Sequence, residues 1–490
     1  MANTVESIMQ ELRQMEIGSF QPNTKRVVLL QRLNSMQAAT RILPTEVLSL
    51  IFQHTCPYIY LDREGRVHNP RGWYSRRFLP LTLGHVCHDW RQVAWSTPNL
   101  WAALSLHVQL NTKLDNITAF LELYLTNVSN FPMSLDLDLP PSPKSPTSIT
   151  NILFRPEYSR KIAFLQVANA PIGWKSSFSS FSRLRHLSLD GHSMEASEEL
   201  SFTDVPSLVQ VSLRDVKSRI ILPWLSITTL HLDCVAIDTC AELFSRCLNL
   251  TAFHCLKALP PQNGWRGLAT VPGPSTSNKL IYYHLESLTW SHVIDSHLLD
   301  LFGHIKLPAI RTLCWSQSRR LDLATPSLDS ELLRHTKVLL YDLPSLISIK
   351  FQHLAIWPTS TIQELFGLVS SVQELTLKYC HQATTHNVLK VLGGTSTRLP
   401  LLRTLIISYP YEVSSEPGHG SYWVLRRQEE DLIVELLTKR LRRGVSSQFR
   451  LELQNASRGW ETLPTYGLRS LIKQGYGLEF VVNGKTMEWL

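Results

Sequence analysis

Leu184-Arg185-His186-Leu187-Ser188-Leu189 follows the template apolar-x-x-apolar-x-apolar. In an extended strand Leu187 and Leu189 point to one face, while His186 and Ser188 point to the other. Such a strand must bury its apolar face against another element. The template recurs with first positions at Ile162, Leu184, Leu208, Ile227, Leu250, Leu285, Ile310, Leu346, Val372 and Leu402.

The template alone decides little, because 44% of the residues are hydrophobic. At that frequency about 40 matches arise by chance along the chain. Proline placement is more informative. Four of the 27 prolines lie two residues before a first position, where ten repeats should give about half of one. These are Pro206, Pro308, Pro344 and Pro400.

Several intervals between the templates have the amphipathic pattern of a helix, as in residues 240–244 and 361–369. Strand and helix thus alternate at 19 to 36 residues per step. This pattern resembles an irregular leucine-rich repeat, in which stacked units bury a continuous core. We assign residues 131–482 to this array, from an alternating strand at 133–139 to a last helix and strand near 466–482.

Alternate side chains of each strand would form a shared polar sheet, which is the expected surface for a protein target. Its predicted members are His186, Ser188, Asp190, Gln210, Ser212, Arg214, His231, Asp233, Lys350, Glu374 and Lys378. The array departs from regular repeats at the Asn or Cys position that bonds neighbouring turns. Cys380 occupies this position in one repeat. The equivalent position in other repeats has His192, Val216, Val293 or Leu354, so we expect an uneven solenoid.

A second organised segment precedes the array. It begins Arg41-Ile42-Leu43-Pro44-Thr45-Glu46-Val47-Leu48-Ser49-Leu50-Ile51-Phe52. Pro44 suits the first position of a helix, and Val47, Leu48, Ile51 and Phe52 then fall on one face. A second helix would align Val86, Trp90 and Val93 and stop before Pro98. A third apolar turn holds Leu100, Trp101 and Leu104. Periodicity alone favours three ordinary core helices of a larger domain.

The order of these motifs resembles an F-box, in particular those of the large F-box families of mushroom-forming fungi. That resemblance implies docking on the Skp adaptor of a cullin–RING ubiquitin ligase, with the rest of the chain capturing a protein substrate. The adaptor contacts it implies are Leu43, Pro44, Glu46, Val47, Ile51, Phe52, Trp90 and Trp101. The module spans 41–106, after an N-terminal helical segment at 1–40. It departs from a compact F-box in a polar insertion at 54–81, which we expect to be a surface loop.

The predicted fold class is therefore α/β, with a short all-helical module followed by an irregular leucine-rich-repeat-type solenoid. No catalytic motif is evident, and neither an enzyme nor a cofactor is expected. Asn483-Gly484-Lys485-Thr486 lacks the upstream glycine of a phosphate-binding loop, because Glu479 stands there, and predicts a tight turn. Cys234, Cys240, Cys247 and Cys255 lack any CxxC spacing, so we expect buried thiols and no metal.

Charge and hydropathy restrict the partners. The net charge is +8, and the basic run at 439–443 is expected to be a solvated helix end, so nucleic-acid binding is a minor hypothesis. No leader or membrane-spanning run is evident, which favours a cytoplasmic or nuclear protein without a membrane partner. One further alternative is open. The chain could be a repeat scaffold without a ligase role, with its helical segment capping the solenoid.

Overall fold

The structure is a computed structural model. It describes residues 6–12, 27–30, 32–33, 40, 43–55, 60–61, 67–68, 79–109, 114–140, 147–191, 199–217, 219–259, 280–292, 302, 305–317, 334, 336–394, 398–409, 421–442, 448–456, 466–474 and 477–487. The chain divides into two compact units, residues 1–185 and residues 186–490. Each unit is described by itself.

Unit 1 combines helices with a parallel sheet in the order β3-β4-β5. A short antiparallel pair, β1 with β2, lies between the first helices. The elements are α3 Thr45–Thr55, β1 Tyr60–Leu61, β2 Val67–His68, α5 Leu79–Gly84, α6 His88–Ser96, η2 Pro98–Trp101, β3 Ala103–His107, α7 Leu114–Asn127, β4 Met133–Asp138, α8 Thr147–Leu153, α9 Pro156–Ser159, β5 Ile162–Ala168 and η3 Ile172–Ser180.

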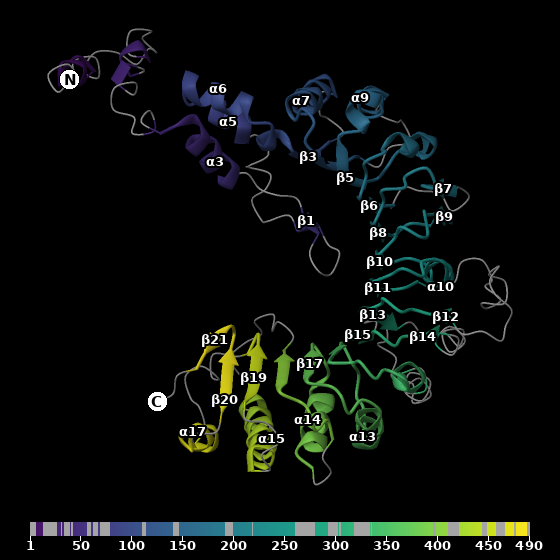
Figure 1. Cartoon of the computed structure of the whole chain (residues 1–490). Coiled ribbons are helices and arrows are strands. Elements are labelled where there is room, and N and C mark those ends of the chain that lie inside the picture. The colour runs from purple at the N-terminus through teal and green to yellow at the C-terminus, as the bar shows by residue number, and fades with distance from the viewer. Residues whose placement is uncertain are drawn as a thin grey trace. The chain divides into compact units, whose positions relative to one another are not determined.

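Unit 2 is built on one long parallel sheet (Figure 1). Its strands are β6 His186–Asp190, β8 Gln210–Arg214, β10 Thr229–Asp233, β11 Ala252–Leu256, β13 Ser287–His292, β15 Thr312–Gln317, β16 Ser348–Gln352, β17 Glu374–Lys378, β18 Thr404–Ser408, β19 Phe449–Gln454 and β20 Leu478–Val482, with β21 Lys485–Thr486 antiparallel at the end. Two short parallel pairs accompany it, β7 Glu199–Ser201 with β9 Arg219–Ile221, and β12 Leu280–Ile281 with β14 Ile305–Lys306.

Helices follow several of these strands. They are α10 Ile237–Arg246, α13 Thr359–Leu368, α14 Gln382–Leu392, α15 Ser421–Arg442 and α17 Tyr466–Lys473. The last four lie on one side of the strands β16 to β20 (Figure 1).

The predicted α/β class is confirmed. The helices expected at 240–244, 361–369 and 466–472 and the strands expected at 133–139 and 478–482 are confirmed as well.

The apolar template is the core of the sheet. All ten first positions, from Ile162 to Leu402, are fully buried. The two later apolar positions are buried as well, as at Leu187 and Leu189, while His186 and Ser188 between them are half-buried. Trp290 and Trp315 occupy buried strand positions and pack in the core.

The proline coincidence has a structural cause in the turns before the strands. The backbone N–H of Leu208 donates to the carbonyl of Val205, and that of Leu346 donates to Leu343. Each pair closes a four-residue turn whose second residue is Pro206 or Pro344. Proline suits this position because its fixed φ is already that of the turn. Pro308 and Pro400 take the same place in their turns.

The tight turn predicted at Asn483-Gly484 is also present. Val482 pairs with Lys485 across a two-residue loop, so Asn483 and Gly484 form its centre. Their φ angles are 49° and 80°, the left-handed values that a type I′ turn requires at both positions.

Three expectations for the N-terminal module are wrong in detail. Leu104 lies in strand β3, so residues 41–106 are not all helical. Val86 precedes α6, which begins at His88 behind the N-cap Cys87, and therefore does not share a helical stripe with Trp90. The insertion at 54–81 was expected to be a loop, but it contains β1 and β2, and α5 begins within it at Leu79. Its other residues from 56 to 78 lie outside the described part of the chain.

The basic run at the end of α15 is not wholly solvated either. Arg440 is buried, and its guanidinium donates to the carbonyls of Leu399, at 3.1 Å, and Arg398, at 2.7 Å. It therefore holds the turn that precedes β18.

In the N-terminal segment, Ile8, Leu12 and Leu29 form a small apolar cluster with Leu33 packed against it. Within the described residues, no helix combines the length and the apolar character needed to cross a membrane.

A buried carboxyl in α15 predicts a pH dependence of stability. Burial raises the pKa of Glu429 to about 7, although the Tyr409 hydroxyl donates to its Oε1 at 2.8 Å and opposes the shift. The Glu429 carboxyl group therefore binds its proton more tightly in the native state than in the unfolded state. Stability should fall as the pH rises from about 4.5 to about 7, and the loss should be complete above pH 7.

Glu429→Gln should accordingly raise the free energy of unfolding at pH 8, on the order of 2 kcal/mol, and should have little effect at pH 4.5. Glutamine keeps the oxygen that accepts from Tyr409. Denaturant unfolding at the two pH values measures this difference. Glu435→Gln, an exposed position of the same helix, is the matched control. Equal effects of Glu429→Gln at both pH values would contradict the assignment.

Candidate functional sites

Helix α3 is apolar on two faces. Successive residues turn by about 100°, so Leu48 and Phe52 share one face while Val47, Leu50 and Ile51 share another. The first face is buried, and the Phe52 ring lies 4.8 Å from the Trp90 ring. The second face is open to solvent. We call Leu43, Val47, Leu50 and Ile51 the α3 surface; their exposed fractions run from 36% to 55%.

Five of the eight adaptor contacts implied by the F-box resemblance are exposed side chains: Leu43, Pro44, Glu46, Val47 and Ile51. Trp90 is half-buried, and its Nε1 donates to Thr40 Oγ1 at 3.4 Å. Leu50 was missed by the sequence reasoning. Leu50 could have been found from its spacing of three residues after Val47, which places both on one helical face.

Phe52 and Trp101 are corrections to the expected contact set. Phe52 is 1% exposed and Trp101 is fully buried. The Trp101 indole donates from Nε1 to the carbonyl of Ala94 at 2.9 Å and packs edge-on against the rings of Trp95 and Tyr124. Both side chains are core residues of unit 1, so neither can contact a partner in this conformation.

In unit 2 the parallel register gathers the predicted polar side chains into rows. Three residues of each strand point away from the apolar core, and the register pairs each with its equivalent on the next strand. The first row begins His186–Gln210, the second Ser188–Ser212–His231 and the third Asp190–Arg214–Asp233. Lys350 lies opposite Thr376, and Lys378 opposite Gln352. We call this surface the polar sheet face.

Charges alternate along the third row. Arg214 Nε lies 3.9 Å from Asp190 Oδ2 and 3.7 Å from Asp233 Oδ2, and Lys257 Nζ lies 4.0 Å from Asp233 Oδ1. Ion pairs of this kind contribute little to stability, about 0 to 1 kcal/mol each. Folding therefore does not require these charges, and they could bind a protein target. Lys257 follows its strand directly and was not predicted.

His231 differs from its expected exposed position because it is buried. Its ring stacks on His254 of the next strand, with centroids 4.3 Å apart and planes 6° from parallel. His254 Nδ1 in turn lies 2.8 Å from Thr289 Oγ1. The stacking follows from the register, which places His231 directly beside His254. Both rings are buried, at 5% and 7% exposed, so neither offers a partner much surface.

A basic segment of the polar sheet face is formed by Lys350 and Lys378. Lys378 Nζ lies 5.2 Å from the centre of the Tyr379 ring, in the geometry of a cation–π contact. Glu374, the predicted acidic residue here, accepts a hydrogen bond from Ser348 Oγ at 3.0 Å. The segment thus offers both charge signs and several hydroxyl groups.

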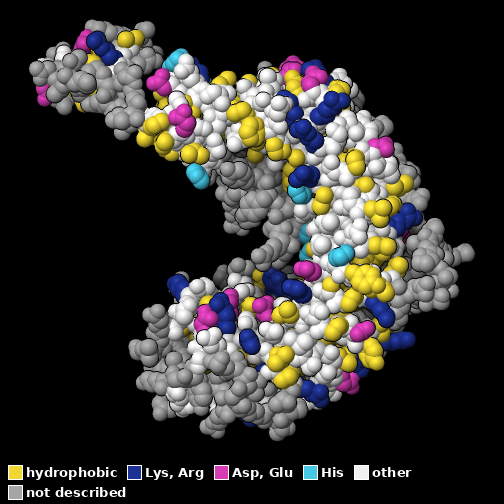
Figure 2. Space-filling model, viewed as in Figure 1, with side chains coloured by type: hydrophobic (Ala, Val, Ile, Leu, Met, Phe, Trp, Pro, Cys, Tyr) yellow, Lys and Arg dark blue, Asp and Glu magenta, His cyan; other side chains and the backbone are white. Residues whose placement is uncertain are grey.

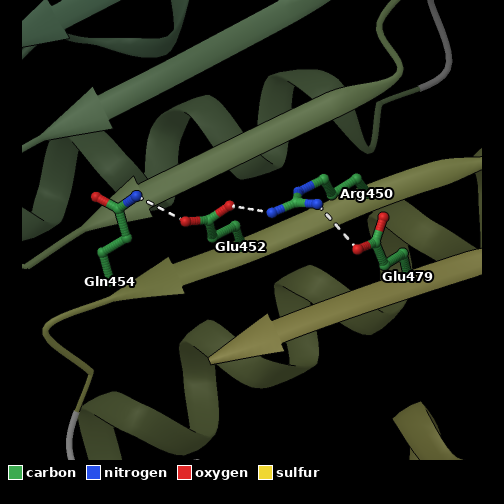
Figure 3. Close-up of polar contacts among 4 residues, drawn as sticks. All are labelled: Arg450, Glu452, Gln454 and Glu479. Atoms are coloured by element: carbon green, nitrogen blue, oxygen red, sulfur yellow. Dashed lines mark hydrogen bonds and ion pairs between the residues drawn. The ribbon is translucent and has the colours of Figure 1, made fainter. Parts of the chain in front are cut away.

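At β19 and β20 the same face carries a network that the sequence reasoning missed (Figure 3). Arg450 donates to Glu479 at 2.9 Å and to Glu452 at 2.8 Å, and Gln454 donates to Glu452 at 2.7 Å. Burial tends to raise the pKa of Glu452, but the hydrogen bonds from Gln454 and Arg450 outweigh it and the pKa is lowered. Glu452 is therefore held as a carboxylate.

The cysteines of unit 2 are free thiols. Cys240 and Cys255 are buried with their sulfur atoms 3.7 Å apart, and burial raises the pKa of Cys240. Burial likewise raises the pKa of Cys247 to about 12. In the part of the chain that the structure describes, no group of three or more His, Cys, Asp or Glu side chains could hold a metal ion.

The comparisons with known proteins add no relative. No protein-family model matches this chain, and a search of curated proteins also finds no match.

Proposed function

We propose that this chain is a non-catalytic substrate-recognition subunit of an SCF-type cullin–RING ubiquitin ligase. In this proposal the α3 surface docks on the Skp adaptor and the polar sheet face binds a protein target. Unit 2 would be an irregular leucine-rich-repeat-type solenoid. Ubiquitin transfer would be carried out by other subunits, which this chain assists by holding the target near them.

The single observation that carries the proposal is the second apolar face of α3. A surface helix normally exposes polar residues opposite its buried stripe. Here Val47, Leu50 and Ile51 are exposed together, although Leu48 and Phe52 already supply the buried face. Contiguous exposed apolar side chains of this kind mark interaction sites. Hydrophobic side chains gather over this region of unit 1 in Figure 2.

The F-box resemblance gives this surface its occupant. The motif residues Leu43, Pro44, Val47 and Ile51 are among the exposed side chains. Both Pro44 at the start of the helix and the aliphatic pair follow the F-box order. An Skp adaptor is therefore the partner that both the sequence and the exposure of these residues favour.

The polar sheet face supports a binding role for unit 2. Its rows combine hydroxyl groups with charges of both signs, as in Arg214 between two aspartates and Lys350 beside Thr376. Such a surface suits recognition of a protein segment by complementary charge, which supplies specificity more than affinity. A ligase subunit of this kind would act in the cytoplasm or the nucleus.

Size-exclusion chromatography of the purified full chain mixed with purified Skp adaptor tests the proposal. We expect the two proteins to elute together at micromolar concentration. Separate elution would contradict the ligase role and favour the alternative of a repeat scaffold with a helical cap.

A further inference from the structure

The last part of unit 1, residues 155–185, has a strong excess of positive charge. Its acidic residue is Glu157, and six residues are basic. The basic residues are Arg155, Arg160, Lys161, Lys175, Arg183 and Arg185. Lys and Arg side chains gather over the α7, α9 and β5 part of unit 1 in Figure 2.

The fold brings the two ends of this stretch together at one edge of the sheet. Arg160 and Lys161 directly precede β5. Arg183 and Arg185 lie beside them at the end of unit 1, where the N–H of Arg185 donates to the carbonyl of Ala163 at 2.8 Å. Strand segments joined by such a bond lie about 4.8 Å apart. The long side chains on both segments are therefore within reach of one ligand.

Two of the cations have partners inside unit 1. Arg155 Nη1 lies 2.9 Å from Glu122 Oε1, and Lys161 Nζ donates to the carbonyl of Leu125 at 2.7 Å. Both cations also face the Tyr158 ring, at 6.0 and 5.7 Å from its centre. Glu122 and Leu125 belong to α7, so these contacts link α7 to the residues around α9.

The three other described cations of the stretch differ. Arg160, Arg183 and Arg185 are exposed, and none of them has an ion pair or side-chain hydrogen bond with a described residue. The carboxylate of Glu157 acts on Lys161 instead. Burial lowers the pKa of Lys161, and Glu157 opposes that shift. We call Arg160, Arg183 and Arg185 the arginine edge.

We propose that the arginine edge binds an acidic segment of another protein. Cations gathered without counter-charges attract a ligand of opposite sign. The planar guanidinium group presents paired N–H donors that match a carboxylate, and it keeps its charge throughout the physiological pH range. An extended segment advances about 3.3 Å per residue, so two or three Asp or Glu side chains within about four residues would span the edge.

Carboxylates fit this edge better than a single-stranded nucleic acid does. Such nucleic acids stack their bases on aromatic side chains in addition to binding through phosphate. The aromatic side chains of residues 154–185 are all buried or half-buried: Phe154, Tyr158, Phe164, Trp174, Phe178 and Phe181. The proposal is independent of the ligase role, because it uses no residue of the α3 surface or the polar sheet face.

Fluorescence anisotropy of the full chain with a fluorescein-labelled deca-glutamate peptide tests the proposal. We expect binding at about 50 mM NaCl that weakens at about 300 mM, because salt screens exposed charges. Gln at all three positions of the arginine edge should weaken binding about tenfold or more, and Lys at the same positions should recover part of the loss.

The matched control combines Lys306→Gln, Arg311→Gln and Lys485→Gln. It removes the same charge from exposed positions of unit 2 and should bind the peptide like the wild type. Circular dichroism of each variant verifies its fold.

Three results would overturn the proposal. The first is a wild type that does not bind the peptide at about 50 mM NaCl, where screening is weak. The second is unchanged binding by the variant with three glutamines, which would place the contact elsewhere. The third is tighter binding of labelled deca-uridylate than of the peptide, with the same dependence on the three arginines. That result would make the ligand a nucleic acid.

Discussion

Replacing Val47 and Ile51 together with glutamate should weaken binding of the Skp adaptor at least 100-fold. Both side chains are about two-fifths exposed and point away from the core of unit 1. Their burial against a partner would be apolar, and a carboxylate at either place would lose its water without gaining a hydrogen bond. A loss of about 2.7 kcal/mol of binding free energy already gives the 100-fold change. Isothermal titration calorimetry of the full chain with the adaptor measures it.

The control for this variant is Leu401→Glu, because Leu401 is 51% exposed but lies in unit 2. It should bind the adaptor like the wild type. The denaturant midpoint of the double variant should also remain near that of the wild type, because exposed positions contribute little to folding. Unchanged adaptor binding by the double variant would remove the α3 surface from the proposed function.

Trp101→Ala should lower the free energy of unfolding by about 4 kcal/mol. The indole is fully buried, its N–H donates to Ala94, and it packs between the rings of Trp95 and Tyr124. Truncation removes these contacts, leaves the Ala94 carbonyl without this donor and opens a cavity in unit 1. Denaturant unfolding followed by tryptophan fluorescence and circular dichroism measures the loss.

Trp95→Ala provides the comparison, since Trp95 packs on the same ring but is 38% exposed. Its cost should be clearly smaller, about 1 to 2 kcal/mol. If Trp101→Ala instead unfolded like the wild type and lost only adaptor binding, Trp101 would be a contact residue after all, as the F-box resemblance implied.

The apolar pattern predicts the sheet of unit 2 only together with the prolines that precede it. A strand with a period of two must place Leu187 and Leu189 on one face, and the prolines before the strands identified the repeats that chance could not explain. The structure adds the reason, which is a turn before each of β8, β15, β16 and β18 with proline in its second position. Such turns can be predicted from the sequence because their conformation depends only on residues that are adjacent in the chain.

Helical periodicity was less informative for α3. The spacing of Val47, Leu48, Ile51 and Phe52 predicts an apolar helix, but it cannot say which pair meets the core. That choice depends on Trp90, about forty residues away, whose ring packs against Phe52. For the same reason Trp101 was assigned to the docking set although it fills the core of unit 1.

Contacts across the sheet could not be predicted because they depend on exact register. The His231–His254 stack and the Arg450–Glu479 pair each join residues more than twenty positions apart. The backbone also takes left-handed φ angles directly after several strands, at Asp215, Cys234 and Lys257. None of these is glycine, so no sequence signal marks the bend.

Hydrogen–deuterium exchange of the full chain, with and without saturating Skp adaptor, locates the docking surface on the molecule. Docking through the exposed apolar face of α3 has a specific signature. It predicts slower exchange in residues 43–55 when the adaptor is present, with unchanged exchange in α13 of unit 2. Unchanged exchange in residues 43–55 at saturating adaptor, or protection confined to unit 2, would contradict it.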